Sequence, residues 1–141
     1  MSNAEANAAV VRRFVEEYQG TGKEEVALEL MAPDFVDRSP FGPFTPDREG
    51  VLGLFRMLRG GFPDLHAEIH DQLVDGDKVV TRKTFHGTHG GELLGIPPTG
   101  REVAFDVIDI VRVRDGLMVE HWNVVDAMAL MTQIGAIPTS T

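Results

Sequence analysis

Residues 101–126 read REVAFDVIDIVRVRDGLMVEHWNVVD and contain the strongest strand signal of the sequence. Apolar and β-branched residues run on both sides of Asp115-Gly116, a dipeptide that favours a tight turn between two paired strands. The stretch therefore predicts one long β-hairpin. Asp109, His121 and Asn123 interrupt its apolar pattern, and a polar group in such a position needs a partner, a wet pocket or a function.

The length of the turn decides which side chains share a face, because a shift of one residue moves every side chain of a strand to the other face. A two-residue turn pairs Asp109 with Trp122. A three-residue turn with a bulge pairs Asp109 with His121 and Val107 with Asn123. We prefer the second register, because it makes Asp109, His121 and Asn123 the only polar members of an apolar face. An apolar wall with a few convergent polar groups is typical of a small-molecule site.

Length and composition predict a single domain over residues 1–141, with 43% hydrophobic and 25% charged residues. The formal net charge of -9 disfavours nucleic acid and other polyphosphate partners, which usually meet a basic surface. The absence of cysteine excludes disulfides and thiolate chemistry. No signal-like or membrane-spanning apolar run is present, so no membrane association is expected and the cytoplasm is the expected compartment.

The periodicity of the remaining sequence predicts helices over residues 4–20, 23–31 and 47–60 and a short helix over 127–134. The proline-rich segment 33–46 is predicted to be a loop. Strands are expected from residue 65 and from residue 78, ahead of a glycine-rich connector over 87–100. This order specifies an α+β fold in which a curved antiparallel sheet wraps around the N-terminal helices as a cone-shaped barrel with an internal pocket.

Four aromatic side chains are the expected substrate-binding wall of this pocket: Phe14, Phe55, Phe62 and Phe105. Arg82, which interrupts the strand VVTRKTF, is a further candidate for substrate binding; the alternative is a solvent-facing position at the end of a strand. The histidines and acidic residues do not match the compact spacing of a zinc site, so no metal site is predicted.

Three segments carry a resemblance to a known family: FPDLHAEI at 62–69, VDGDKVVTRKTFHGTHGGELLGIPPTGREV at 74–103, and IVRVRDGLMVEHWNVVD at 110–126. In this order they resemble the SnoaL-like polyketide cyclases, within the nuclear transport factor 2-like fold superfamily. The resemblance implies an α+β barrel or cone, frequent homodimers formed through the outer face of the sheet, and no metal or organic cofactor. It also implies ring closure of polyketide esters by intramolecular aldol condensation.

The resemblance assigns the site less directly. The cyclases carry an aspartate as general acid/base where this chain has Asn123, and a histidine where this chain has Asp109. An amide takes up no proton at neutral pH, so the carboxylate has moved across the hairpin. Asp109, His121 and Asn123 are therefore the expected catalytic residues. Each also has a structural explanation: Asp109 as the partner of Arg82 or Arg112, His121 as a hydrogen-bonded buried residue, and Asn123 as a bridge to backbone or water.

Three functions follow as hypotheses. The first is a cofactor-independent enzyme that performs aldol-type or related proton-transfer chemistry on a hydrophobic small molecule. The second is an epoxide hydrolase or hydratase in which Asp109 activates water. The third is a noncatalytic ligand-binding module, which Asn123 favours. Separately, Ile108, Ile110 and Trp122 on the outer hairpin face predict a homodimer, because together they form a sizeable apolar patch.

Overall fold

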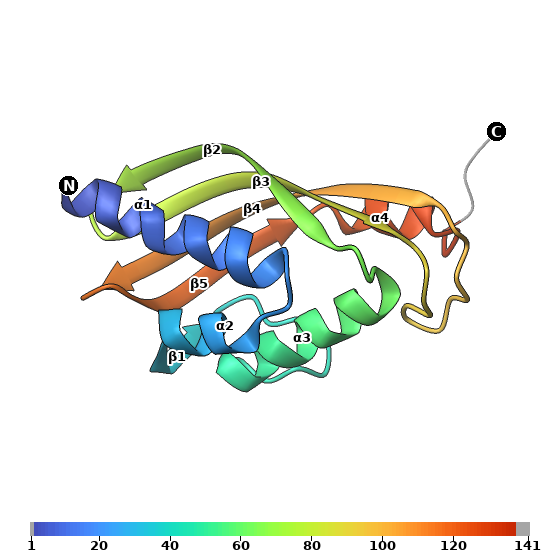
Figure 1. The fold of residues 1–141 in the computed structure, drawn as a ribbon, viewed down its shortest axis with the longest axis horizontal. Coiled ribbons are helices and arrows are strands. Elements are labelled where there is room, and N and C mark those ends of the chain that lie inside the picture. Colours follow the sequence, from blue (N-terminus) through green and yellow to red (C-terminus); the bar gives the residue numbers. More distant parts are fainter. Residues whose placement is uncertain (1, 138–141) are drawn as a thin grey trace.

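The computed structural model describes residues 2–137, which form a curved five-stranded sheet with helices packed on one face (Figure 1). The α+β class and the curved sheet are confirmed. The sheet remains open, and its strand order is β1-β5-β4-β3-β2. The elements are α1 (Asn3–Phe14), a π-helical turn η1 (Val15–Gln19), α2 (Glu24–Leu30), β1 (Met31–Asp37), α3 (Arg48–Gly61), β2 (His66–Asp75), β3 (Lys78–Thr88), β4 (Glu102–Arg114), β5 (Leu117–Val125) and α4 (Ala127–Gln133).

The edge strand β1 lies in part of the segment that was predicted to be a loop. It pairs parallel to β5, whereas all other neighbouring strands pair antiparallel. Pro33 is compatible with this strand, because an edge position does not require every backbone N–H for sheet pairing. Phe35 points inward and is 3% exposed, so burial of an aromatic ring outweighs the local proline signal.

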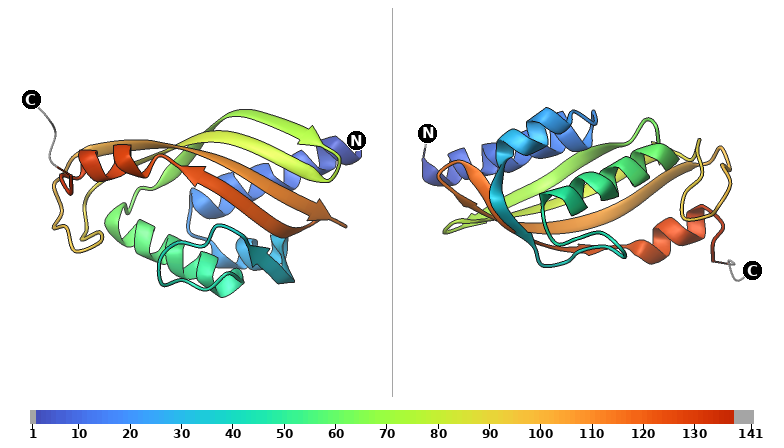
Figure 2. Two further views of the ribbon diagram at one scale, coloured as in Figure 1. Left: turned by 180° about the vertical axis from the view of Figure 1, so that it is seen from behind. Right: turned by 90° about the horizontal axis from the view of Figure 1, so that it is seen from below.

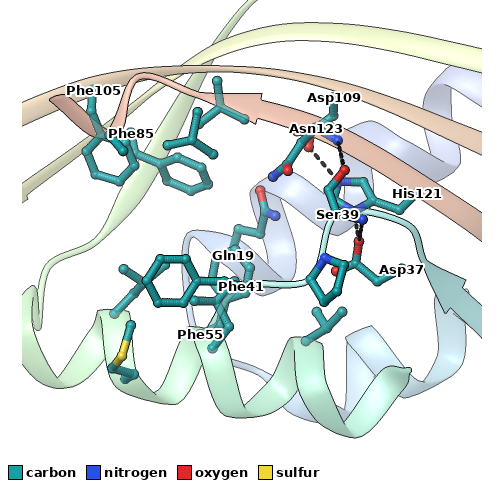
Figure 3. Close-up of a pocket in the computed structure, with 18 of the residues that line it drawn as sticks. Gln19, Asp37, Ser39, Phe41, Phe55, Phe85, Phe105, Asp109, His121 and Asn123 are labelled. Carbon is teal, nitrogen blue, oxygen red and sulfur yellow. Dashed lines mark hydrogen bonds and ion pairs between the residues drawn. The ribbon is translucent and has the colours of Figure 1, made fainter. Parts of the chain in front are cut away.

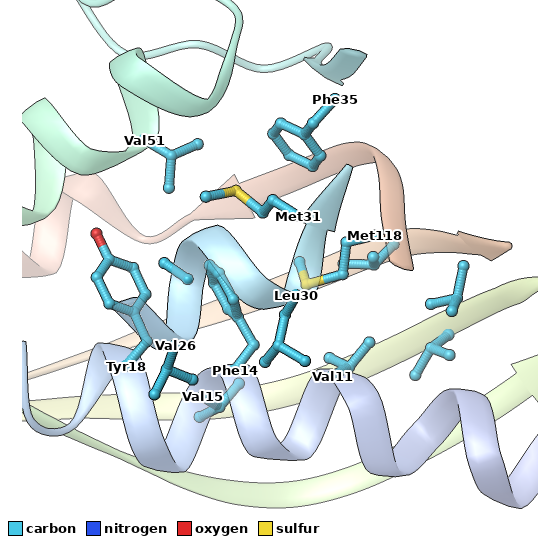
Figure 4. Close-up of a cluster of buried hydrophobic side chains, with 14 of the residues drawn as sticks. Val11, Phe14, Val15, Tyr18, Val26, Leu30, Met31, Phe35, Val51 and Met118 are labelled. Atoms are coloured by element: carbon cyan, nitrogen blue, oxygen red, sulfur yellow. The ribbon is translucent and has the colours of Figure 1, made fainter. Parts of the chain in front are cut away.

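Helices α1, α2 and α3 cover the concave face of the sheet, and α4 lies beside the N-terminal end of β4 (Figure 2). One hydrophobic cluster joins α1, η1 and α2 to β1 and β5, as Figure 4 shows for Phe14, Leu30 and Met118. A second cluster joins the C-terminal end of α3 to β3, β4 and α4. Phe55 on α3 packs against both clusters and so lies between the two cores. None of the helices within residues 2–137 is long and apolar enough to cross a membrane.

Candidate functional site

A cavity of about 420 Å³ lies between the concave face of the sheet and the helices. Its wall is mainly aromatic and aliphatic, with Phe14, Phe35, Phe41, Phe55, Phe85 and Phe105 supplying the rings. Its polar groups include one charged or amide side chain from each of η1, β1, β3 and β4 and two from β5: Gln19, Asp37, Lys83, Asp109, His121 and Asn123. Figure 3 shows all of these except Lys83. The cavity is therefore an apolar chamber that also presents convergent polar groups, the usual form of a small-molecule site.

The hairpin brings its polar residues into this cavity by a route that neither predicted register describes. Arg114 pairs with Leu117 across a two-residue turn, whose Asp115 and Gly116 both have positive φ angles, 50° and 77°. The pairing then shifts by one residue at Val119, between the pairs Val113–Met118 and Arg112–Glu120. The prediction of a three-residue turn was therefore wrong.

The bulge nevertheless restores the face that the preferred register predicted. Beyond it Asp109 pairs with Asn123, and Val111 pairs with His121. Side chains alternate along each strand, so Asp109, His121 and Asn123 all point to the concave side. The predicted pairing of Asp109 with His121 is corrected to a diagonal contact. Met118, rather than Leu117 or Val119, supplies the buried residue near the turn, with 2% exposure.

Five polar side chains form a continuous chain along the polar side of the cavity. The Nδ1 atom of His121 lies 3.0 Å from Asp37 Oδ1, and its Nε2 atom lies 2.6 Å from Asp109 Oδ1. The second oxygen of Asp109 lies 2.5 Å from Lys83 Nζ. Lys83 in turn donates to Gln19 Oε1 at 2.8 Å. Acidic and basic groups thus alternate from Asp37 to Lys83.

The surroundings of His121 favour its charged form. Each ring nitrogen faces a carboxylate oxygen, so an imidazolium satisfies both contacts with N–H donors, whereas a neutral ring has only one. Burial by itself lowers the pKa of His121, but the hydrogen bonds with Asp109 and Asp37 outweigh burial and raise the pKa to about 9. His121 is therefore an imidazolium at neutral pH.

Asp109 is held as a carboxylate by the same arrangement. Burial by itself raises the pKa of Asp109, but the charge of Lys83 and the hydrogen bond with His121 lower it to about 2. The residue is 5% exposed, so this charge lies almost entirely inside the protein. Asp109 and His121 together form a carboxylate–imidazolium pair at neutral pH, in which Asp109 is buried and His121 is half-buried.

Asn123 contributes a side-chain amide that lines the cavity. Within residues 2–137 this amide has no hydrogen-bond partner, while the backbone N–H of Asn123 donates to Ser39 Oγ at 3.1 Å. The loop after β1 is held on the other side as well, because the Ser39 N–H donates to Asp37 at 3.0 Å. The loop is thereby fixed beside the site, and the amide of Asn123 remains available to a ligand.

Of the five predicted substrate-binding residues, Phe14, Phe55 and Phe105 line the cavity, whereas Phe62 and Arg82 lie elsewhere. Phe62 is fully buried in the second core cluster, where it packs against His89. Arg82 points to the outer face of the sheet and pairs with Asp71 at 2.7 Å, with 53% of its side chain exposed. Its outward direction follows from strand alternation, because the buried members of β3 are Val79, Thr81, Lys83 and Phe85.

Sequence reasoning missed Lys83, Gln19 and Asp37. A signal for Lys83 was present, since counting in steps of two from Phe85 places Lys83, and not Arg82, on the inner face. Gln19 and Asp37 carried no comparable signal: the first closes a π-helical turn and the second ends a strand that was predicted to be a loop. The alternative partners of Asp109 are also corrected, because Arg112 pairs with Asp77 and Glu120 on the outer face.

Comparison with known proteins places this geometry in a family. The model of the SnoaL-like polyketide cyclase family matches residues 9–134. Aklanonic acid methyl ester cyclase DnrD of Streptomyces peucetius is 30% identical over 134 residues, covering 89% of this chain and 88% of the relative.

Solved structures agree with the sequence match. IdmH of Streptomyces antibioticus is 36% identical with a TM-score of 0.81, covering 92% of this chain and 98% of that one. A polyketide cyclase candidate from Bacillus cereus ATCC 10987 is 31% identical with a TM-score of 0.86, covering 98% and 87%. An epoxide hydrolase from M. tuberculosis, 16% identical with a TM-score of 0.72, shares the fold alone. Because the family match extends over most of its length, the chain belongs to the SnoaL-like polyketide cyclase family.

Proposed function

We propose that the protein is a cofactor-independent cyclase that closes a ring in a hydrophobic small molecule by an aldol-type reaction. The observation that carries this proposal is the Asp109–His121 pair, whose Nε2–Oδ1 contact of 2.6 Å lies in the wall of the apolar cavity. Curated relatives named as cyclases of aklanonic acid methyl ester support a substrate of this class. The epoxide hydrolase alternative has only a distant structural neighbour in its favour.

The resting pair holds the base and the acid that an aldol closure needs. The carboxylate of Asp109 takes a proton from a carbon next to a carbonyl group, and the enolate carbon attacks a second carbonyl of the same molecule. The imidazolium of His121 gives a proton to the new alkoxide. Asp109 then returns its proton to His121 across their hydrogen bond. One C–H bond and the π bond of the attacked carbonyl break, one C–C bond and one O–H bond form, and no net proton is consumed.

The low pKa of Asp109 restricts the substrate. A carboxylate whose pKa is lowered by the neighbouring Lys83 and His121 is a weak base, so the carbon acid must itself be strongly acidified. A carbon between two carbonyl groups meets this requirement, because both carbonyls share the charge of the enolate. We therefore expect a 1,3-dicarbonyl unit in the substrate, with the free amide of Asn123 donating to one of its oxygens.

Ring closure of aklanonic acid methyl ester, followed by chromatography, tests the proposal. Asp109→Asn and His121→Gln should each lower kcat by about 10² or more, the usual contribution of a positioned acid or base. Asp106→Asn is the matched control, because it makes the same chemical change on the same strand at the exposed face. A folded Asp109→Asn protein with the wild-type rate would remove Asp109 from the mechanism. Wild-type protein that binds the ester without converting it would support a noncatalytic binding module instead.

We further propose that the outer face of the sheet pairs with a second copy of the chain. Ile108 and Val124 lie opposite each other there, 47% and 76% exposed, and the neighbouring pair is Ile110–Trp122. An apolar patch of this kind is typical of an interface. The location of the protein in the cytoplasm, which the sequence favours, remains a prediction.

A further inference from the structure

Lys83 is a lysine inside the protein, 2% exposed, and it lies in the wall of the cavity. Lysine is almost never fully buried unless its charge has partners, because removing an ammonium group from water is costly. The partners of Lys83 are Asp109 Oδ2 at 2.5 Å and Gln19 Oε1 at 2.8 Å. The fold therefore fixes one positive charge beside the carboxylate that the proposed reaction uses as its base.

Gln19 helps to position the ammonium group of Lys83. It ends the π-helical turn Val15–Gln19, an irregularity that is often found at functional sites, and its side chain reaches the cavity (Figure 3). Its amide oxygen accepts one hydrogen of the Lys83 ammonium group. The ammonium also lies 5.0 Å from the centre of the Phe85 ring, another wall residue.

An ammonium group has three N–H donors, and the partners described above use two of them. Among residues 2–137 no third acceptor is bonded to Lys83 Nζ. A group that served only as the counter-ion of Asp109 would need no access to the cavity. Lys83 instead combines a fixed charge, a spare donor and a place in the cavity wall.

We propose that Lys83 is a catalytic residue whose ammonium group contacts the substrate and stabilises the negative oxygen of its enolate. This inference rests on the proposed ring-closing function and assigns the enolate a specific partner. The substrate class that fits is a 1,3-dicarbonyl compound with an aromatic portion, because Lys83 attracts the enolate oxygen while Phe85 and its neighbours pack against the ring. In the absence of an enolate, Asp109 remains the counter-ion of Lys83.

Benzoylacetone is a suitable probe, because it is an aromatic 1,3-diketone whose enolate absorbs at a different wavelength from the neutral form. A pH titration of absorbance with the probe bound measures its apparent pKa without any turnover. The wild-type cavity should lower the apparent pKa of the probe relative to free solution. An opposite charge at contact distance typically changes a pKa by about 1 to 3 units. Unchanged titration of the probe in the wild-type cavity would overturn the proposal.

The decisive comparison uses the Asp109→Asn background, in which Lys83 has lost its counter-ion. There Lys83→Met should raise the apparent pKa of the bound diketone by about 1 to 3 units. The double variant also removes both charges of the pair together, so it leaves no unpaired buried charge to unfold the protein. If Lys83 served only Asp109, the second substitution would leave the titration unchanged, and the proposal would be wrong.

Lys78→Met is the matched control, because Lys78 is on the same strand but lies over Trp122 on the outer face. It removes the same charge without touching the cavity, and the probe should titrate as in the parent protein. The proposed function can fail separately from this inference. A protein that lowers the pKa of the diketone through Lys83 but closes no ring would retain the enolate site and reject the cyclase.

Discussion

Asp109 forms ion pairs with two cationic groups, and these pairs explain how a carboxylate with 5% exposure stays ionised. Lys83 contacts one oxygen and His121 contacts the other, so each carboxylate oxygen has a donor. Removing one member of such a set strands the charge of its neighbour, whereas removing a matched pair does not. The site residues are therefore coupled, and effects of single substitutions are not expected to add.

The two pKa shifts predict how stability depends on pH. The pKa of His121 is raised from 6.5 to about 9 in the folded protein, so its contribution is complete below pH 6.5 and is lost as the pH rises through 9. The pKa of Asp109 is lowered from 3.8 to about 2, so its contribution is present above pH 3.8 and is lost as the pH falls through 2. The site therefore contributes most to stability between about pH 4 and 6.5.

Urea unfolding of wild type and His121→Gln across this range measures the effect. The difference between their free energies of unfolding should be largest between pH 4 and 6.5 and should shrink as the pH approaches 9. Each unit of pKa difference corresponds to about 1.4 kcal/mol. A difference that stays constant from pH 5 to pH 10 would show that His121 carries no folding-linked charge.

The polar residues within apolar strands identified more of the site than the predicted length of the turn did. Asp109, His121 and Asn123 were recognised as polar residues in apolar strands, and all three line the cavity. Lys83 was overlooked in favour of Arg82, although simple alternation from Phe85 separates the two. A long basic side chain usually keeps its charge in water, so the residue type of Lys83 favours the outer face although the periodicity of the strand favours the inner one.

At the scale of elements, the hairpin shows what a local sequence leaves open. Asp115-Gly116 predicted the turn, because both residues must adopt positive φ angles and this dipeptide tolerates them. A two-residue turn alone would have turned Trp122 inward and His121 outward. The extra residue Val119 reverses this, and no local signal in that strand specified it. The bulge is favoured by tertiary packing, since it directs His121 to Asp37, while Met118, on the turn side of the bulge, is buried by the two-residue turn itself.

Strand β1 was missed for a similar reason. Four prolines between residues 33 and 46 favour a loop, and the parallel pairing with β5 joins segments that are more than 80 residues apart. Local propensity carries no information about such a partner. The helices were predicted more successfully, because their apolar periodicity is itself local and their burial follows from it.

At the scale of the whole molecule, the helices and the curved sheet enclose a cavity between two hydrophobic clusters. The two clusters stabilise the walls, so the cavity can remain lined by large side chains without being filled by them. The overall class followed from the order of predicted elements, whereas the open edge of the sheet did not. The position of that edge depends on the pairing of β1 with β5, and the segment that forms β1 was predicted to be a loop.

The apolar outer face of the sheet predicts that two copies of the chain associate. Sedimentation at about 10 µM should show a dimer, since association hides the apolar pair Ile108 and Val124 from water. Ile108→Glu with Val124→Glu should shift the protein to a monomer, because a dimer would then bury unpaired carboxylates. Leu28→Glu is the control, as Leu28 is 42% exposed on α2, on the helical side of the molecule. A wild-type monomer at this concentration would contradict the prediction.

The proposed mechanism requires that the resting site holds a carboxylate and an imidazolium together, which supply base and acid to one substrate. The most direct measurement is the ¹⁵N chemical shifts of the His121 ring at pH 7, assigned by comparison with His121→Gln. We expect two protonated ring nitrogens and a titration near pH 9. A neutral ring at pH 7, with one nitrogen bare, would contradict it, because the pair would then lack the acid that protonates the new alkoxide.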